Sequence, residues 1–356
     1  MKIEKLTFIP HRLKRRGRWQ TSSYTADYVD VFYVTIQTDD GVTGIGAASV
    51  VPNSRGDPFV EGLQAVKSAA CALFVGKDPL QVGPLMNALH RAVPGYTRHK
   101  AGIELALYDL IGKALNVSLS TLLGGGTRDV IPVLKMLSLG SPAEMAETAS
   151  RFVQQGYRHL KVKLGTGPVG DLECFKAVRS AVGPKVTLTV DLNGAYDTST
   201  AINVVASLAP QGLAMVEQPV RGADLDSMAA VTKAVEPVVL ADQGVQSARD
   251  VFQIARDGVA KAVSIKVLKF GGLRESLAGA RICEASGLIC HVGGTASSRL
   301  VDAAQAHFIS ATPGVVIPCE IGEFEALEGD LVEGLQVVDG HVRVPTGPGI
   351  GIKLNV

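Results

Sequence analysis

Charged residues recur at the ends of five consecutive β-branched segments in the middle of the chain. They are Lys163, Asp191, Glu217, Asp242 and Lys266, separated by 28, 26, 25 and 24 residues. A single charged residue at such a position is usually a solvated loop start or a helix cap. Five in succession at one period are hard to explain in that way, and they indicate a shared site.

Three of these residues are carboxylates, Asp191, Glu217 and Asp242, and no cysteine or histidine stands among them. An oxygen-only set favours Mg²⁺ over zinc, with Mn²⁺ as the alternative. Such an ion polarises a substrate carboxylate and stabilises the enediolate that forms when an α-proton leaves. The pattern therefore predicts a metal site that takes a small-molecule carboxylate.

Two lysines bracket a valine in "HLKVK" (159–163). Residues two apart in a strand point the same way, so Lys161 and Lys163 share a face. A neighbouring ammonium group disfavours the charged form of a lysine, so we expect Lys161 to help Lys163 act as a base near neutral pH. We expect Lys266 to lie on the other side of the metal.

Short β-branched segments that alternate with amphipathic helical patterns must position these residues. The predicted strands are 130–136, 159–163, 187–191, 214–217, 237–242, 262–266, 288–292 and 316–320. The helix after Ser141 opens with a capping box to Glu144, and other helical patterns end at glycine. Eight units of roughly 25 residues predict a (β/α)8 barrel, with its active site at the C-terminal strand ends. An open doubly wound sheet is the rival, but even spacing favours closure.

The first part of the chain has a different pattern. "DVFYVTIQTDDGVTGIGAA" alternates around a DDG turn like an antiparallel hairpin, and "GIELALYDLIGKAL" is typical of a helix. The C-terminal segment contains a second hairpin pattern with a DG turn. We predict an α+β capping domain over 1–125, the barrel over 126–322, and a tail over 323–356 that returns to the cap.

The composition fits a globular protein, with 46% hydrophobic and 19% charged residues. A net charge of +1 without a basic run gives no indication of a nucleic-acid or membrane partner. No signal-peptide pattern or membrane-spanning run is recognisable. Five scattered cysteines suit a reducing compartment, so we predict a cytoplasmic protein.

The sequence resembles the enolase superfamily and, within it, the muconate lactonizing enzyme subgroup. The matching pieces are "KVK", "DLN", "VEQP", "LAD", "SIKVLKFGG", "HVGGT" and "CEIGEF", together with "DDGVTGIGAA" and "AGIELALYDLIGKALNVSLSTLLGG" near the N-terminus. These pieces span nearly the whole chain, and their combination is specific.

The resemblance implies a cap built from both termini over a barrel, and a homo-oligomer. It implies Mg²⁺ bound by Asp191, Glu217 and Asp242. It also implies that Lys163 and Lys266 are acid/base groups on opposite substrate faces and that Lys161 is their helper. Asn193 would support the metal shell, and Glu320 matches a strand-eight glutamate of the cycloisomerases.

The sequence departs from the subgroup at the substrate end of the site. Asp242 is followed by Gln243 and Gly244, where Asp-Glu-Ser is usual. "HVGGTASS" lacks the acidic residue that often follows the strand-seven glycines. "CEIGEF" replaces a Phe-Gly-Pro type ending, and the Asp-x-Asp of dipeptide epimerases is absent. Substrate specificity therefore cannot be transferred from the best-known members.

We expect two mobile loops of the cap, 15–28 and 49–59, to determine specificity. The candidate substrate-binding residues are Trp19 and Tyr24, which would exclude water, Glu320 and Glu323, which would hold a cationic nitrogen, and Asn193 and His291. Arg15, Arg16 and Arg18 are candidates to meet a second anionic group, with a solvated loop as the alternative. For His291 the alternative is a core histidine, and for Glu323 it is a surface loop.

Three reactions can follow the same enediolate: racemisation or epimerisation, β-elimination, and cycloisomerisation. We favour an isomerase acting on an amino-acid derivative, because of the acids near strand eight. A dehydratase, that is a lyase acting on a hydroxy amino or imino acid such as a hydroxyproline, is the alternative. Muconate is less favoured, and so is a sugar acid, because the mandelate racemase branch uses a His-Asp pair where this chain has Lys266. A non-catalytic binding barrel is the third hypothesis, and the intact lysines argue against it.

Overall fold

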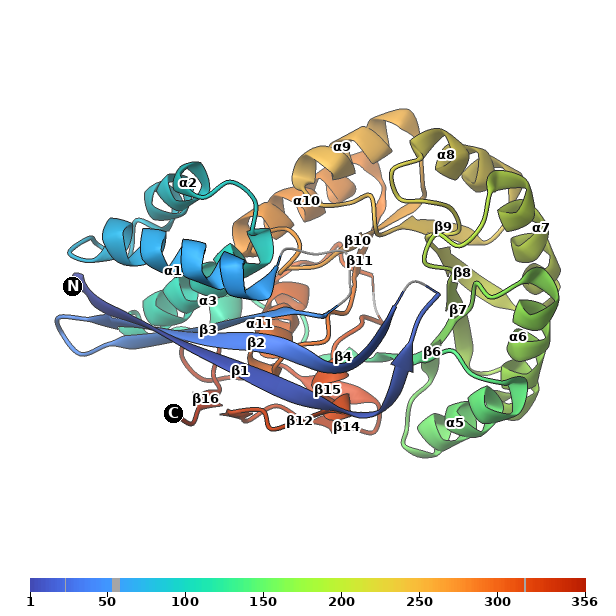
Figure 1. Ribbon diagram of the computed structural model, residues 1–356, viewed down its shortest axis with the longest axis horizontal. Helices are drawn as coiled ribbons and strands as arrows, with labels where there is room; N and C mark the ends of the chain where they lie inside the picture. The colour runs from blue at the N-terminus through green and yellow to red at the C-terminus, as the bar shows by residue number, and fades with distance from the viewer. Residues whose placement is uncertain (23, 53–57, 317) are drawn as a thin grey trace.

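The computed structural model describes residues 1–22, 24–52, 58–316 and 318–356. It has two parts, a cap and a barrel (Figure 1). Among the described residues, no helix is both long and apolar enough to cross a membrane. Residues 53–57 of the predicted loop 49–59 lie outside the described part, as does residue 23 of the loop 15–28.

The cap is a four-stranded antiparallel sheet with helices packed on it. Its strand order is β12-β1-β2-β3, with bounds β1 (Ile3–Gln20), β2 (Thr25–Thr38), β3 (Thr43–Val50) and β12 (Leu327–Glu328). The helices are α1 (Phe59–Phe74), α2 (Val82–Ala92), α3 (Thr97–Ala114) and α4 (Leu119–Leu122). The predicted DDG hairpin is confirmed, because Gln37 pairs with Thr43 across a turn that contains Gly41 at φ +86°. Gly46 lets α3 pack closely on β3, since a Cβ there would collide with the carbonyl oxygen of Gly102.

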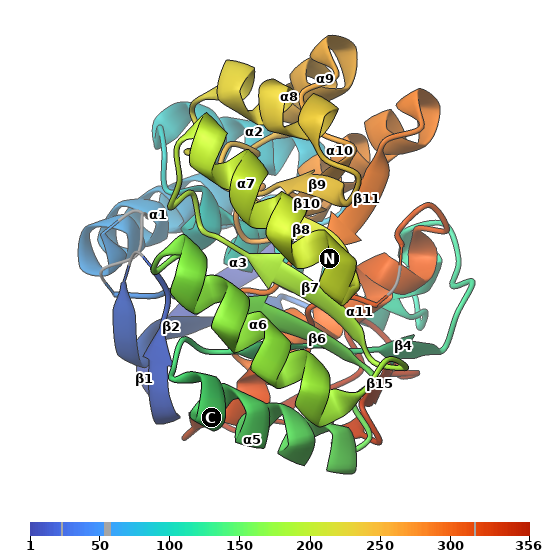
Figure 2. The same ribbon diagram turned by 90° about the vertical axis from the view of Figure 1, so that its right-hand side faces the viewer.

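The barrel contains a seven-stranded parallel sheet in the order β11-β10-β9-β8-β7-β6-β5 among the described residues. The strands are β5 (Leu134–Leu137), β6 (His159–Lys163), β7 (Thr187–Asp191), β8 (Leu213–Glu217), β9 (Val238–Ala241), β10 (Ala262–Ile265) and β11 (Ile289–Val292). The helices are α5 (Pro142–Gln154), α6 (Pro168–Val182), α7 (Thr198–Leu208), η1 (Ala209–Gln211), α8 (Leu225–Ala234), α9 (Ala248–Asp257), α10 (Leu273–Ser286) and α11 (Arg299–Ala311). Figure 2 shows α5, α6 and α7 on the outer side of the strands. The predicted α/β barrel with an N-terminal cap is confirmed.

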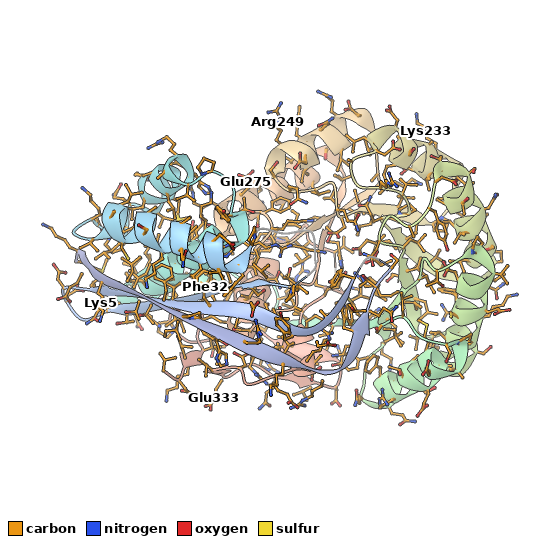
Figure 3. All side chains as sticks on the ribbon, in the orientation of Figure 1. Lys5, Phe32, Lys233, Arg249, Glu275 and Glu333 are labelled. Atoms are coloured by element: carbon orange, nitrogen blue, oxygen red, sulfur yellow. The ribbon has the colours of Figure 1, made fainter. Side chains whose placement is uncertain are left out.

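Local signals fix these elements as predicted. Ser141 and Glu144 form the capping box of α5, and α9 and α10 end at Gly258 and Gly287, both with left-handed backbone. Lys233 and Arg249 lie exposed on the outer helices, whereas Phe32 is fully buried within the cap (Figure 3). The apolar residues of cap and barrel form one contiguous core, and the charged strand ends lie at its edge.

Two of the eight predicted strands were wrong. Segment 130–136 divides into β4 (Val130–Pro132), which pairs outside the barrel, and β5, which is the first barrel strand. Segment 316–320 is not a regular strand among its described residues. Parallel bridges from Val315 to Cys290 and from Cys319 to Val133 instead close the ring between β11 and β5. Pro318 lacks the N–H that a continuous ladder needs.

The C-terminal tail contacts both parts of the molecule. It contains η2 (Glu323–Ala326), β12, β13 (Val332–Glu333), β14 (Val337–Val338), β15 (His341–Arg343) and β16 (Lys353–Leu354). The predicted DG hairpin is β14–β15, and it pairs with β4. β12 pairs with β1, and the backbone N–H of Ile350 donates to Asp109 of α3 at 2.7 Å. The tail thus reaches the cap, while the exact domain limits stay a prediction.

The predicted loop 15–28 was wrong in kind, because most of it belongs to the β1–β2 hairpin. Trp19 and Gln20 still pair with β2, beyond a register shift that follows Lys14. The hairpin extends from the cap toward β6 and β7 (Figure 1). At its end Ser22 donates to the carbonyl of Leu192, and Gln20 bonds with Ser138. A paired hairpin that contacts the barrel therefore carries cap side chains to the C-terminal strand ends.

Candidate active site

A cavity of about 610 Å³ lies at the C-terminal ends of the barrel strands, beneath the β1–β2 hairpin. Its walls include these predicted site residues: Trp19, Tyr24, Lys161, Lys163, Asp191, Asn193, Asp242, Lys266, Glu320 and Glu323. Glu217 and His291 are buried beneath this wall, with 1% and 4% of their surfaces exposed. The structure thus brings the predicted residues together at one strand-end cavity.

Strand register places the acids side by side. Lys163 at the end of β6 pairs with Asp191 on β7, which pairs with Glu217 on β8. Asp242 follows β9 directly, and Gln218 accepts its backbone N–H at 2.9 Å. The parallel register therefore brings three carboxylates to the same edge of the sheet.

Asn193 orients Asp191. Its backbone N–H donates to Oδ1 of Asp191 at 2.8 Å, and its side-chain amide donates to Oδ2 at 3.1 Å. Its backbone has φ of +48°, a left-handed conformation that asparagine tolerates better than most residues. Asn193 therefore acts on the site through a carboxylate that it holds in place.

The acidic set fits a divalent cation by its chemistry. Oε1 of Glu217 is buried and has no hydrogen-bond partner. Burial and the nearby charge of Asp191 raise the pKa of Glu217 above its usual value. An orphaned carboxylate oxygen in an all-oxygen set is the kind of group that a hard cation satisfies.

In this structure, lysine ammonium groups contact the three carboxylates. Lys161 contacts Glu217 at 3.0 Å and Asp191 at 3.7 Å, Lys163 contacts Asp191, and Lys266 and Lys269 each lie 2.9 Å from Asp242. Accordingly, no three acidic, histidine or cysteine side chains among the described residues converge as a finished metal site. A divalent cation shared by these carboxylates would replace ammonium contacts that they make in this structure.

Lys163 and Lys266 flank the carboxylates on opposite sides. In the sheet order, β7, β8 and β9 separate β6 from β10, and they precede or carry the three acids. Burial alone would lower the pKa of Lys266, but Asp242 and Glu217 raise it well above its usual value. A divalent cation bound by those acids would neutralise their negative charge and repel the ammonium group. The pKa of Lys266 would then fall, which favours the neutral amine. The structure thus places one lysine amine on each side of the three carboxylates.

Lys161 is enclosed by three carboxylates. Burial would lower its pKa, but Glu217, Glu320 and Asp191 raise it well above the usual value. The repulsion predicted between Lys161 and Lys163 is therefore offset by carboxylates that contact both ammonium groups. Lys161 is a fixed cation in this site.

Glu320 is engaged with the protein. Its Oε1 accepts from Lys161 at 2.6 Å and from His291 at 3.1 Å, and its Oε2 accepts from the backbone N–H of Gly294 at 3.0 Å. Burial would raise the pKa of Glu320, but Lys161 and His291 hold it well below its usual range. The carboxylate is thus an internal acceptor at the cavity wall.

The cap provides a second charged pair. The guanidinium of Arg15 lies over the ring of Trp19 at 4.1 Å and 3.4 Å from Glu323. Arg16 instead pairs with Glu328 at the surface, and the side chain of Arg18 lies outside the described part. Of the three candidate arginines, Arg15 is therefore the one that the structure places in the cavity wall.

Sequence reasoning missed several residues of the cavity. Lys269 stands three positions after Lys266 in "SIKVLKFGG" and donates to both the side chain and the carbonyl of Asp242. Burial lowers its pKa to about 8. Arg98 enters from the start of α3, where no local pattern marks it. Gly293 belongs to the motif "HVGGT". Its missing side chain leaves room for Lys266, since a Cβ there would lie 2.6 Å from Cε of Lys266.

Comparisons with known proteins agree with this architecture. The family model "Mandelate racemase / muconate lactonizing enzyme, N-terminal domain" matches residues 3–124, and "Enolase C-terminal domain-like" matches residues 144–356. The chain belongs to the mandelate racemase/muconate lactonizing enzyme family of the enolase superfamily, as the motifs predicted.

Individual relatives are similar over almost their whole length. Muconate cycloisomerase 1 of Rhodococcus opacus is 32% identical over 98% of this chain and 95% of its own. The crystal structure of an N-succinyl Arg/Lys racemase from Bacillus cereus covers 100% and 96%, with 27% identity and a TM-score of 0.96. A dipeptide epimerase from Enterococcus faecalis, complexed with Mg and L-Leu-L-Tyr, covers 99% of both chains, with 27% identity and a TM-score of 0.94. The chain is an enzyme of the isomerase class.

Proposed function

We propose that the protein is a Mg²⁺-dependent isomerase that removes and returns the α-proton of a carboxylate substrate. The observation that carries this proposal is the placement of Lys163 and Lys266 on opposite sides of Asp191, Glu217 and Asp242. Those three carboxylates would hold the ion, with Asn193 orienting Asp191. Mg²⁺, with Mn²⁺ as a substitute, would supply positive charge that stabilises the enediolate.

The lysines divide the proton transfers between two faces. One amine, at Nζ of Lys163 or Lys266, takes the α-proton, and the opposite ammonium returns a proton to the other face of the same carbon. The substrate thereby inverts its α-configuration, and the two lysines exchange protonation states. Lys161 stays charged throughout and faces the oxygen atoms where negative charge grows.

We propose an amino-acid derivative with a polar or charged distal group as the substrate. Arg15 and Glu323 form an opposite-charge pair at the cavity wall, the ring of Trp19 lies under Arg15, and Tyr24 also lines the cavity. Glu320 already accepts three hydrogen bonds, which leaves Glu323 as the better candidate for a cationic nitrogen. The named specificities of the racemase and epimerase relatives support this class, and the cycloisomerase relatives support ring opening or closure as a variant.

The first test is α-deuterium incorporation in D2O with Mg²⁺. The probes are N-acyl amino acids, dipeptides, hydroxyprolines and lactones, and wild type is compared with Lys163→Ala and Lys266→Ala. We expect the wild type to exchange the α-hydrogen with all other substrate atoms retained, and both variants to lose racemisation. A product formed from the substrate by loss of one water molecule would identify the dehydratase instead. Mg²⁺-dependent ligand binding without any exchange would identify a non-catalytic barrel. The homo-oligomeric state and cytoplasmic location stay predictions.

A further inference from the structure

His291 is a buried polar residue on the inner face of β11 that the proposed chemistry does not use. Its Nε2 lies 3.1 Å from Oε1 of Glu320, and that same oxygen lies 2.6 Å from Nζ of Lys161. The exposed fractions are 4% for His291, 2% for Glu320 and 1% for Lys161. His291 is absent from the cavity wall that Lys161 and Glu320 share. It therefore contacts the site through Glu320 and not through the cavity.

The direction of this hydrogen bond follows from chemistry. An ionised carboxylate only accepts, so Nε2 of His291 must carry the hydrogen. Glu320 is thus held by donors from three separate elements: Lys161 on β6, His291 on β11 and the backbone N–H of Gly294 after β11. Three such donors fix both the plane and the position of the carboxylate.

The position of the Lys161 ammonium group depends mainly on its contact with Glu320. Its remaining partners are Glu217 at 3.0 Å and Asp191 at 3.7 Å, the two carboxylates assigned above to the cation. When those acids serve the cation, Glu320 is the carboxylate that remains for the buried ammonium group. A buried charge without a partner would be costly, so the placement of Lys161 depends on Glu320.

We propose that His291 is a positioning residue that holds Glu320 in place and thereby fixes Lys161 against the reacting carboxylate of the substrate. This inference rests on the proposed function, because Lys161 matters to the rate only if negative charge develops beside it. Loss of the Nε2 donor lets the Glu320 carboxylate rotate and Lys161 follow it. The defect then falls on stabilisation of the enediolate and much less on substrate binding.

The test compares His291→Leu with His291→Gln. Glutamine carries its side-chain N–H donor the same number of bonds from Cα as Nε2 of histidine, so it can restore the contact to Glu320, whereas leucine cannot. His307→Gln is the matched control, because His307 is also buried but lies in α11 and contacts the carbonyl of Ile350. The measurements are steady-state kinetics and exchange on a substrate of the wild type, Mg²⁺ affinity by calorimetry, and thermal unfolding.

We expect His291→Leu to lower kcat by about 10- to 100-fold, the range typical for loss of a supporting contact, with KM changed by less than about 3-fold. His291→Gln should recover most of that loss, and His307→Gln should leave kcat near the wild-type value. Equal activity of the Leu and Gln variants would overturn the inference. So would a defect confined to KM, which would indicate direct substrate contact, or a defect that tracks thermal stability alone.

A measurement independent of activity separates this inference from the proposed function. Long-range ¹⁵N–¹H spectra of the wild type, assigned by comparison with His291→Gln, should show hydrogen on Nε2 of His291. Hydrogen on Nδ1 alone would overturn the inference even in an active enzyme. Conversely, an Nε2–H signal in a protein that exchanges no α-proton would contradict the proposed function. The hydrogen bond from His291 to Glu320 would then have a structural role only.

Discussion

Gly293 makes room for Lys266. A Cβ on this glycine would lie 2.6 Å from Cε of Lys266 and would also collide with Ser264, so the lysine side chain passes through space that only glycine leaves open. The glycine follows β11, one strand beyond β10, which precedes Lys266. The relationship links a motif glycine to the position of a proposed acid/base group.

Gly293→Ala should therefore displace Lys266 and reduce turnover by about 10-fold or more, because small misplacements of a proton-transfer group are costly. Steady-state kinetics combined with thermal unfolding would check this. Gly170→Ala in α6 is the control, since a Cβ there meets nothing closer than 3.9 Å and alanine favours a helix. Full activity in Gly293→Ala would mean that the position of Lys266 is not critical.

Chelation should abolish α-proton exchange, and Mg²⁺ should restore it. Asp191→Asn, Glu217→Gln and Asp242→Asn should each weaken Mg²⁺ binding by at least about 10-fold, because each removes one charged ligand. Isothermal calorimetry measures the affinity directly. Asp226→Asn, an exposed acid at the start of α8, should bind as the wild type does. Undiminished affinity in all three site variants would refute the assigned ligands.

Arg15→Met should raise KM for substrates with a negatively charged distal group by about 10-fold and leave kcat nearly unchanged, because the guanidinium contributes the same binding energy before and during the reaction. Kinetics on substrates with and without the distal charge would measure the difference. Arg16→Met is a matched control from the same strand, since Arg16 pairs with Glu328 at the surface. Equal effects of both variants would remove Arg15 from the substrate site.

Glu104 should make stability depend on pH. This carboxylate of α3 accepts the backbone N–H of Arg274 at 2.9 Å, and burial raises its pKa from 4.5 to about 7. The folded state therefore holds its proton more tightly than the unfolded chain between pH 4.5 and 7. The contribution of Glu104 to the free energy of unfolding therefore falls as pH rises through that window.

Glu104→Gln keeps an acceptor for Arg274 and removes the titration. The variant should be more stable than the wild type at pH 8, by about 3 kcal/mol, and this advantage should shrink toward pH 4.5. Denaturant titrations across that range would measure it. Glu147→Gln, on the exposed side of α5, should leave the pH profile unchanged. Parallel profiles for wild type and Glu104→Gln would contradict the account.

The strand-end residues could be predicted from the sequence because their signals are local. β6 and β7 have the predicted bounds, since apolar alternation ends directly at Lys163 and Asp191. Segments 130–136 and 316–320 failed because distant parts of the chain decide their pairing. The β14–β15 hairpin draws β4 out of the barrel, and Pro318 interrupts the last segment. These are tertiary effects that no short window contains.

In the cavity wall, too, local signals could be predicted and long-range contacts could not. Glu320 was identified as a site residue, but its donors Lys161, His291 and Gly294 lie 26 or more residues from it in the sequence, so its role as an internal acceptor was not predictable. Arg98 lines the cavity from the start of α3 in the cap, far in sequence from the barrel strands. Contacts between segments distant in the sequence therefore decide what these residues do, and a local pattern does not contain such contacts.

The two-sided arrangement of Lys163 and Lys266 is tested most directly by deuterium exchange started separately from each enantiomer of a substrate in D2O. Each single alanine variant should lose racemisation yet retain α-exchange with one enantiomer, and the two variants should retain opposite enantiomers, because each remaining lysine faces one side of the α-carbon. Loss of exchange with the same enantiomer in both variants, or unimpaired racemisation in either, would contradict the account.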